Sequence, residues 1–462
     1  MKTSHRAGSD DPADQYITTS DNTRSRAGKS RRAGIAGLAG SFLEYYDFAS
    51  YAFLIVFMAP LFFPSDNPAS PVLASFGVFA VGYAARPVGA FFFGSFGDRH
   101  GRRKALLVTV VGMGAATTVM GLIPTYASIG IAAPILLVLL RMVQGFSTGG
   151  ESSGAATLVA ESGDRRHGLR QALVPSGCIA GSSAAPFVIA ITTAIVGTEE
   201  MATWGWRIPL LFSAVLTTVI LMYRLRIEES EPFSALARES RLTRSPISTM
   251  LRSHWRQIVG VLVIALVTGI PQAILVSYMN VYMINVAGLA RTTVYFVSAI
   301  CLLLSISGYF LGGYLVDRRG ARTALFSGLG ALAVLIYPVM TLMLEYDHPA
   351  LIGLLYTLVL TATATATTPV WAIATHAFPT SMRYSGVAVS TNIGSTLGQG
   401  TGPLMATALV AGTGVAQSPA FLMASAALVG IVVGLIITRS PHLRAEAHPD
   451  PEPDAAIAGH TA

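Results

Sequence analysis

The sequence predicts an all-α membrane protein with twelve transmembrane helices in two six-helix halves and both termini in the cytoplasm. Three observations carry this prediction. The chain of 462 residues is 52% hydrophobic and only 12% charged, whereas soluble proteins are about 25% charged. Apolar runs of about 20 residues, enough to cross a bilayer core, recur along the chain. Loop motifs of the first half return in the second half at a nearly constant distance.

The apolar runs are separated by short stretches that are charged or rich in turn-forming residues. One globular core could not bury so much apolar surface, so each run is interpreted as a membrane-spanning helix. The predicted spans are 35–63, 71–96, 105–123, 130–160, 171–196, 206–226, 256–284, 292–316, 323–344, 349–377, 384–411 and 418–438.

The positive charges are distributed unevenly between the two sides of the predicted helices. Arg86 and Arg141 lie within spans, and only Arg207 and Arg291 lie at connections that follow odd-numbered helices. The other Lys and Arg residues occupy the two ends of the chain and the remaining connections. Basic residues stay on the cytoplasmic side, which places both termini there. The net charge of +7 therefore reflects topology, and no nucleic-acid partner is expected.

Two motif pairs indicate that the halves are homologous. The loop GSFGDRHGRRK after the second span returns as GGYLVDRRGAR after the eighth, and Asp98 and Asp317 are 219 residues apart. RRHG at 165–168 returns as RYSG at 383–386, 218 residues later. The predicted organisation is a disordered cytoplasmic leader (1–32), an N-terminal bundle (33–226), a cytoplasmic linker (227–255), a C-terminal bundle (256–439) and a disordered cytoplasmic tail (440–462).

The polar side chains fall on particular helices. The third, sixth, ninth and twelfth spans carry no charged or amide side chain in their interiors, whereas the first, second, fourth, seventh and eleventh do. Polar side chains inside a membrane face protein or a water-filled cavity. Every third helix is therefore predicted to be peripheral, and the others to line an interior.

In this twelve-helix context the GDRHGRR loop and its partial copy resemble the signature of the major facilitator superfamily. Six further motifs resemble the metabolite:proton symporter family, which includes proline/betaine, α-ketoglutarate, citrate and shikimate transporters. They are EYYDF (44–48), ARPVGA (85–90), RMVQGFSTGGE (141–151), WGWRIP (204–209), EESEPF (228–233) and FPTSMRYSG (378–386). The resemblance covers about residues 35–438. It departs at Ser152 and Ser153, which follow Glu151 where relatives commonly have an aromatic residue.

The stretch FLEYYDF places Glu44 and Asp47 inside the first span, although a charge at the bilayer centre costs about 2.5–3.5 kcal/mol on insertion scales. At 1.5 Å per residue, both acids lie about 14–18 Å deep, level with Arg141 of the fourth span. Glu151 lies about 15 Å closer to the cytoplasm than Arg141. Depth alone predicts two charge clusters. One joins Glu44 and Asp47 to Arg141, and the other joins Glu151 to Arg86.

These acids outnumber the arginines, so one carboxylate is expected to lack a partner. Burial without a partner favours the protonated form of a carboxylate, whereas Arg stays protonated and cannot carry a proton. Glu44 or Asp47 is therefore predicted to carry a coupling proton. The alternative is that both are permanently paired and only fix helix packing. For Arg86 and Glu151 the favoured interpretation is structural, with Glu151 bracing a gate.

A substrate site is predicted around the fourth span. Arg141 and Gln144 lie on one helix face, and Arg is suited to bidentate recognition of a carboxylate. Arg141 is predicted to bind a substrate carboxylate, although it could instead only pair with the acids. Gln144, Trp371 and Asn392 are the further candidates, with packing as their alternative role.

The GDRHGRR loop and its copy are predicted to form a gate. The family resemblance implies that this loop latches the cytoplasmic side in the outward-facing state. A simple basic turn would explain the arginines but not Asp98 or Asp317. The predicted gate and bracing residues are Arg86, Gly94, Gly97, Asp98, Arg99, Gly101, Arg102, Arg103, Glu151, Asp317, Arg318, Arg319 and Arg383.

The resemblance and the charges together predict a proton-coupled symporter that imports a small carboxylate-bearing metabolite, such as an organic acid or a proline/betaine-type osmolyte. The alternative is a proton-coupled exporter of cationic or drug-like compounds. A sensor that kept this fold should carry an added signalling domain, which the short tails do not supply. The sequence has no GxxxxGK[ST] loop or HExxH motif, so neither ATP-driven transport nor an enzyme is expected.

Cys178 and Cys301 lie in apolar runs without the spacing of metal ligands, so no cofactor or metal is expected. The expected partners are the substrate, the proton and the lipid bilayer. We expect a monomer in the plasma membrane.

Overall fold

The computed structural model describes residues 12–65, 69–162, 167–239, 246–285, 288–289, 291–346 and 348–438. Their regular structure is helical throughout, without a strand. The long helices of the first half are α1 (Pro12–Phe62), α2 (Ala69–His100), α3 (Arg102–Leu122), α5 (Ala132–Glu161), α7 (Leu173–Val196) and α9 (Arg207–Leu225). Those of the second half are α12 (Trp255–Ala273), α14 (Arg291–Arg319), α15 (Ala321–Glu345), α16 (Pro349–His376), α17 (Arg383–Thr413) and α18 (Ser418–Thr438).

Short helices join these elements. They are α4 (Tyr126–Ile129), α6 (His167–Gln171), α8 (Thr198–Glu200), η1 (Met201–Gly205), α10 (Glu231–Arg238), α11 (Pro246–Ser253) and η3 (Thr380–Met382). The seventh long helix, α12, continues through the π-helical η2 (Ile274–Tyr278) into α13 (Met279–Asn285).

The predicted twelve-helix architecture is confirmed. Eleven helical stretches in the described ranges are long and apolar enough to cross a membrane. The twelfth, α17, has 31 residues but is rich in Gly, Ser and Thr. It packs chiefly on α12, α2 and α5, which agrees with its being less apolar than the other spans.

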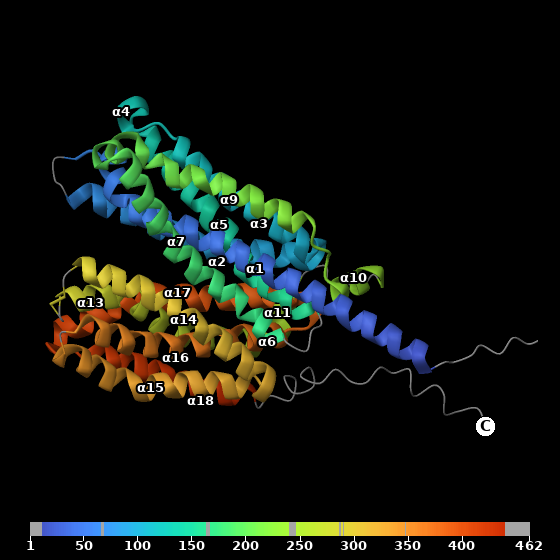
Figure 1. The fold of residues 1–462 in the computed structure, drawn as a ribbon. Coiled ribbons are helices and arrows are strands. Elements are labelled where there is room, and N and C mark those ends of the chain that lie inside the picture. Colours follow the sequence, from blue (N-terminus) through green and yellow to red (C-terminus); the bar gives the residue numbers. More distant parts are fainter. Residues whose placement is uncertain are drawn as a thin grey trace, which may run out of the picture.

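The two halves form separate bundles with the same internal packing (Figure 1). In the first half α1 packs on α7, α2 on α5 and α3 on α9. The corresponding helices of the second half pair in the same way, with α12 on α17, α14 on α16 and α15 on α18. The halves contact each other chiefly through α2 with α17, α5 with α17 and α14 with α6 and α7.

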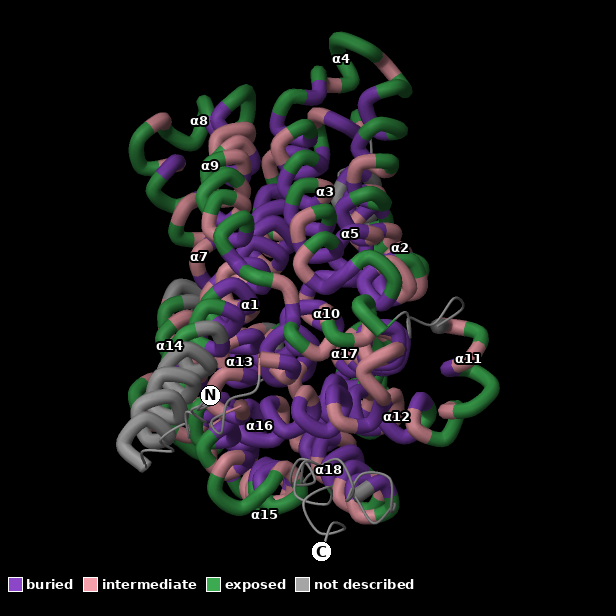
Figure 2. The backbone as a smooth tube through the Cα atoms, turned by 90° about the vertical axis from the view of Figure 1, so that its right-hand side faces the viewer, coloured by how far each residue is buried: buried purple, intermediate pink, exposed green. Residues whose placement is uncertain are grey.

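The predicted peripheral helices are confirmed. The main packing partners of α3, α9, α15 and α18 all belong to their own half. Figure 2 shows buried residues along the inside of the bundles and exposed residues on their outer faces. Large apolar side chains are exposed there, including Val56, Ile195, Val334 and Leu404. In a membrane these side chains face lipid instead of water.

Glycine seams hold the paired helices close together. A Cβ at Gly145 or Gly149 of α5 would collide with the backbone carbonyl of Gly82 or Arg86 in α2. The second half repeats this arrangement, because Gly394 and Gly398 of α17 lie against backbone carbonyls of α12. Only a residue without a Cβ permits such close approach.

Three segments differ from the predicted organisation or lie outside the described residues. The helix α1 begins at Pro12, so residues 12–32 of the predicted disordered leader are helical. Extending an existing helix adds one hydrogen bond per ordered residue and avoids the cost of nucleation. The linker 227–255 contains α10 and α11. The predicted tail, 440–462, lies outside the described residues.

Candidate substrate and proton site

The first charged contact in the bundle joins α1 to α2. Arg86 Nη2 lies 3.2 Å from Glu44 Oε1, and Ser152 Oγ of α5 donates to Glu44 Oε2 at 2.8 Å. The Arg86 guanidinium also lies over the rings of Phe48 and Tyr83, 4.4 and 4.6 Å from their centroids. The prediction that Arg86 pairs with Glu151 is therefore wrong. Depth was a poor guide because the long Arg side chain reaches about a helical turn from its own backbone.

Glu151 pairs with a residue that the sequence did not single out. Arg224, near the end of α9, is bonded to both Glu151 carboxylate oxygens. Thr109 Oγ1 donates to Glu151 Oε2 at 2.7 Å, and Arg224 also donates to the backbone carbonyls of Leu106 and Ala36 at 2.8 and 3.0 Å. The network is buried and its charges are matched. All its members belong to the first half, so the role of Glu151 at a gate stays a prediction.

Arg224 changes the predicted charge count. Its position at the end of the sixth span suggested one more basic residue of the cytoplasmic side. The side chain is only 2% exposed, however. Its burial next to Glu151 adds a third arginine to the predicted clusters, so that Arg86, Arg141 and Arg224 match Glu44, Asp47 and Glu151 in number.

Asp47 and Arg141 are joined by a chain of hydrogen bonds instead of an ion pair. Thr117 Oγ1 of α3 donates to Asp47 Oδ2 at 2.7 Å. Gln144 Nε2 of α5 donates to Thr117 Oγ1 at 2.7 Å, and Arg141 Nη1 donates to Gln144 Oε1. All four side chains are fully buried. The predicted Asp47–Arg141 pairing thus becomes an indirect link, and the predicted Glu44–Arg141 pairing is wrong.

The Arg141 guanidinium lies in an aromatic cluster formed by Phe48, Tyr51 and Phe79, at 4.6, 4.2 and 5.1 Å from the ring centroids. Its Nε and Nη2 have no hydrogen-bond partner among the described residues, and neither has Asp47 Oδ1. Buried polar groups are nearly always satisfied in proteins. Arg141 therefore holds two donors, and Asp47 one acceptor, that are available to a ligand or a proton.

Two of the predicted substrate residues have other contacts in this conformation. Asn392 Nδ2 donates to the carbonyl of Gly149 in the other half, at 2.9 Å, and to that of Ala388, also at 2.9 Å. Trp371 packs with Phe91 against an apolar cluster around Phe378. The contacts of both residues are thus inter-half or packing contacts. Their substrate-binding role stays a prediction.

The second half has its own polar group near the interface. Gln272 Nε2 of α12 donates to Tyr309 Oη of α14 at 3.1 Å, and Thr367 Oγ1 of α16 donates to Gln272 Oε1 at 3.5 Å. The stretch ATATATT that contains Thr367 is helical within α16. These groups are neutral, so the charged chemistry belongs to the first half.

Asp98 joins the halves at the end of the molecule that carries the α2–α3 and α14–α15 loops, which we call the motif end. Its carboxylate accepts from the backbone N–H groups of Tyr384 and Ser385 at 3.2 and 2.8 Å. These groups open α17, whose N-terminal dipole favours an anion. Tyr384 Oη in turn donates to the carbonyl of Gly150 at 2.6 Å.

The repeated motif forms the matching contact in the other direction. Asp317 of α14 accepts from the backbone N–H groups of Gly168 and Leu169 at 2.7 and 3.0 Å. Gly168 ends the RRHG motif, whose residues 165–166 lie outside the described residues. The two sequence repeats therefore meet in space. The Asp of each half binds the helix start that follows the equivalent loop in the other half.

Further ion pairs stabilise the contact between the halves at the motif end. Arg102 is fully buried and lies 3.2 Å from Asp98 and 3.0 Å from Glu161. It also donates to the carbonyls of Gly97 and Thr380 at 3.0 and 2.6 Å. Arg383 of the second half lies 3.4 Å from Glu161. Glu161 is thus shared by both halves, a role the sequence did not indicate because Glu161 sits at the end of an apolar run.

The glycines of this loop are required by space and by backbone conformation. A Cβ at Gly94 would meet the Ser385 backbone, and one at Gly97 would meet the Tyr384 ring. Gly101 has φ +108° and precedes α3. Only glycine reaches this φ without strain.

The remaining predicted gate arginines are exposed or contact residues of their own half. Arg103 donates to the carbonyl of Leu225 at 2.6 Å. Arg318 lies over the Tyr314 ring, 5.6 Å from its centroid. Arg99, Arg318 and Arg319 are exposed. The structure thus brings Asp98, Arg102 and Arg383 together at the motif end and leaves Arg99, Arg318 and Arg319 outside this cluster.

The model of the Major Facilitator Superfamily matches residues 38–403. The chain belongs to this superfamily. It is 33% identical over 435 residues to the proline/betaine transporter of Salmonella typhimurium, covering 91% of this chain and 85% of the relative. It is 35% identical over 438 residues to the ectoine/proline transporter ProP of Corynebacterium glutamicum, covering 89% of this chain and 85% of the relative.

The fold agrees with a solved member of the same superfamily. The structure of the proton:xylose symporter XylE bound to 6-bromo-6-deoxy-D-glucose superposes with a TM-score of 0.70 at 16% identity, over 89% of this chain and 95% of that chain. The superfamily match and the named transporter relatives show that this chain is a transporter and a multi-pass protein of the plasma membrane.

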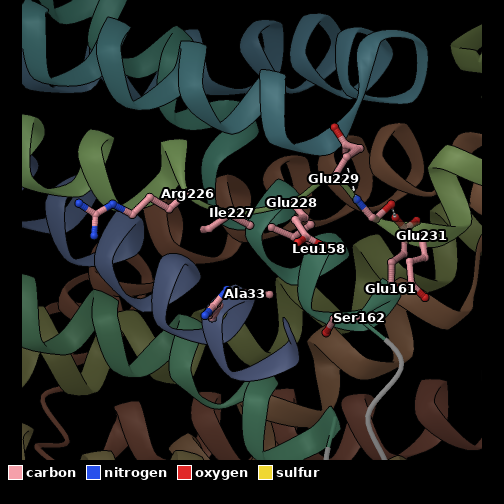
Figure 3. Close-up of a pocket in the computed structure, with 11 residues that line it drawn as sticks. Ala33, Leu158, Glu161, Ser162, Arg226, Ile227, Glu228, Glu229 and Glu231 are labelled. Atoms are coloured by element: carbon pink, nitrogen blue, oxygen red, sulfur yellow. Dashed lines mark hydrogen bonds between the residues drawn. The ribbon is translucent and has the colours of Figure 1, made fainter. Parts of the chain in front are cut away.

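A small surface cavity of about 40 Å³ lies at the motif end, between α1, α5 and the start of the linker (Figure 3). It is lined by Arg32, Ala33, Leu158, Glu161, Ser162, Arg226, Ile227, Glu228, Glu229, Ser230 and Glu231. Glu161 is 20 residues from Arg141 on the same helix, or about 30 Å at 1.5 Å per residue. The cavity thus lies at the motif end and is separate from the site at Arg141.

Proposed function

We propose that this protein is a proton-coupled symporter that imports a small zwitterion of the proline/betaine type, with Arg141 binding its carboxylate and Asp47 carrying the proton. The observation that carries the proposal is that two residues of one buried hydrogen-bond network each have polar atoms without a partner. Arg141 has two donors without an acceptor, and Asp47 has one oxygen without a donor. The organic-acid alternative shares the carboxylate and differs in the rest of the molecule.

The charge balance explains how a proton and a carboxylate would be coupled. Arg86 is paired with Glu44 and Arg224 with Glu151, so only Arg141 and Asp47 have no ion-pair partner within this set. While Asp47 is ionised, the site is neutral overall. Protonation of Asp47 leaves the Arg141 charge uncompensated, and burial strengthens the attraction of that charge for an anion. A carboxylate would then bind most favourably after the proton.

The relatives support the choice of substrate class. Their names specify proline, betaine and ectoine, small molecules that each combine a carboxylate with a nitrogen-centred positive charge. The alternative of a cation exporter is disfavoured by Arg141. Arg141 is buried at the site, and its positive charge would repel a cationic substrate.

The gate supports alternating access. At the motif end the halves are joined by Asp98, Asp317 and the shared Glu161. The charge asymmetry of the sequence assigns this end to the cytoplasm, so the conformation is closed on the cytoplasmic side. Import would require these contacts to break as one half rocks against the other. The site at Arg141 and the gate both lie within one chain, so a monomer is sufficient.

Uptake by purified protein in proteoliposomes tests the proposal. Radiolabelled proline, betaine, ectoine and a dicarboxylate are supplied with and without an inwardly directed proton gradient. We expect the gradient to drive accumulation of at least one zwitterion, and a protonophore to abolish that accumulation. If the gradient leaves uptake of all four unchanged, proton-coupled import of this substrate class is wrong.

A further inference from the structure

We propose that Thr117 and Gln144 are positioning residues that transmit the protonation state of Asp47 to Arg141. This inference rests on the proposed function and adds the route by which the proton affects substrate binding. It starts from the separation of the two charged groups. No ion pair joins Asp47 and Arg141 in the described structure, yet three consecutive hydrogen bonds connect them through these two side chains.

The Thr117 hydroxyl has two acceptors within reach. It lies 2.7 Å from Asp47 Oδ2 and 3.1 Å from the backbone carbonyl of Met113. An ionised carboxylate only accepts hydrogen bonds, whereas a protonated one can donate. With Asp47 ionised, the Thr117 proton points to the carboxylate. With Asp47 protonated, the acid proton points to Thr117 Oγ1, and the Thr117 proton turns to the Met113 carbonyl.

This reversal reaches Gln144. Its Nε2 donates to Thr117 Oγ1 at 2.7 Å, and a hydroxyl oxygen has two lone pairs. While Thr117 donates to ionised Asp47, that bond polarises the hydroxyl and strengthens its oxygen as the acceptor of Gln144. When Asp47 is protonated, Thr117 Oγ1 accepts from both Asp47 and Gln144, and the contact that holds the amide in place is weaker. Gln144 Oε1 is the acceptor of Arg141 Nη1. A loosened Gln144 frees this donor beside the two that already lack a partner, and Arg141 can then turn to a substrate carboxylate.

In the described structure, the connection from Asp47 to Arg141 runs through Thr117, whose hydroxyl can reverse its hydrogen bond when Asp47 is protonated. Arg141 of α5 is the charged residue that acts on Asp47 across the bundle. Arg86 of α2 is held by Glu44, one turn before Asp47 on α1. The other groups near Asp47 are hydroxyl or phenol groups, namely Thr117 of α3, Ser213 of α9 and Tyr46 of α1.

The test compares Thr117→Val with Thr118→Val. Thr118 is the next residue, but in the described structure its hydroxyl bonds the carbonyl of Gly114. Binding of labelled betaine to purified protein is measured at mildly acidic and mildly alkaline pH, which requires no transport cycle. We expect wild type and Thr118→Val to bind betaine about tenfold more tightly at acidic pH, within the range of typical coupling between sites. Thr117→Val should bind with nearly equal affinity at both.

Thr117→Ser keeps the hydroxyl and should restore the pH dependence, which separates positioning from a packing defect. Gln144→Leu, which breaks the next bond of the chain, should also lose it. The inference is overturned if Thr117→Val is folded and retains the wild-type pH dependence, or if Thr118→Val loses it equally. If wild-type protein shows no gradient-driven uptake in the preceding experiment, the proposed function itself fails, and the two failures are thereby distinguished.

Discussion

Arg86 Nη2 lies 3.2 Å from Glu44 Oε1, and this contact distinguishes the two acids of FLEYYDF. Glu44 has a fixed cationic partner and also accepts from Ser152. Asp47, one helical turn further along α1, accepts from Thr117 and has no ion-pair partner among the described residues. Neutralising Glu44 should therefore affect the protein differently from neutralising Asp47.

Neutralising Glu44 should impair folding more than coupling. Glu44→Gln leaves the buried Arg86 without its anion, and breaking a buried ion pair from one side costs about 3–5 kcal/mol. We expect a lower melting temperature and lower yield, while the protein that does fold still responds to the proton gradient. Thermal unfolding in detergent and uptake per folded protein measure the two effects. A stable Glu44→Gln protein that has lost only its response to the gradient would move the proton assignment to Glu44.

Replacing Arg141 should weaken carboxylate binding. Arg141→Lys keeps the charge but loses the planar fork that allows bidentate contact, so we expect betaine affinity to fall by about tenfold or more, given about 1.5–3 kcal/mol for a charged hydrogen bond. Choline, which has the quaternary ammonium of betaine but no carboxylate, should not compete with betaine in wild-type protein. If choline displaced labelled betaine at the same concentrations as unlabelled betaine does, Arg141 would not be recognising the carboxylate.

Removing Arg102 should destabilise the closed motif end. Arg102→Ala leaves Asp98 and Glu161 buried without this cation, at a cost of about 3–5 kcal/mol to the closed state. Arg99→Ala removes an exposed arginine of the same loop and serves as the control. We expect Arg102→Ala to shift the population towards the conformation open at this end, and Arg99→Ala to leave it unchanged.

Thiol labelling measures this shift. A cysteine replaces the buried Ser385 beside Asp98, in protein whose Cys178 and Cys301 are replaced by alanine. A membrane-impermeant maleimide should label it faster in Arg102→Ala than in Arg99→Ala. Equal rates in the two variants would argue against a latch at Arg102.

The seam between α12 and α17 should tolerate no added methyl group. In Gly398→Ala the new Cβ would collide with the Leu266 carbonyl, and overpacking costs about 1–3 kcal/mol. Gly400→Ala, on the same helix, meets open space, and alanine is about 1 kcal/mol better than glycine within a helix. Thermal unfolding should therefore show a lower melting temperature for Gly398→Ala only. Equal melting temperatures would mean that the seam can relax.

Much of the fold could be predicted from sequence because membrane helices are determined by long apolar runs and by the side on which basic residues lie. The repeats also singled out Asp98 and Asp317, which join the two halves in the structure. The ion pairs could not be predicted, because depth along a helix does not give the direction of a side chain. Arg224 shows this most clearly: it lies at the end of α9, yet its guanidinium reaches the buried Glu151. Thr117 was missed for a related reason, since threonine is common in such helices and only its contact with Asp47 marks it.

The most direct test of the central claim is the proton movement that betaine causes. Betaine is added to a weakly buffered suspension of proteoliposomes without an imposed gradient, and the external pH is recorded. We predict that wild-type protein takes up protons with betaine, so the external pH rises, and that Asp47→Asn produces no change although it still exchanges betaine across the membrane. A pH rise of wild-type size in Asp47→Asn would contradict the assignment of the proton to Asp47.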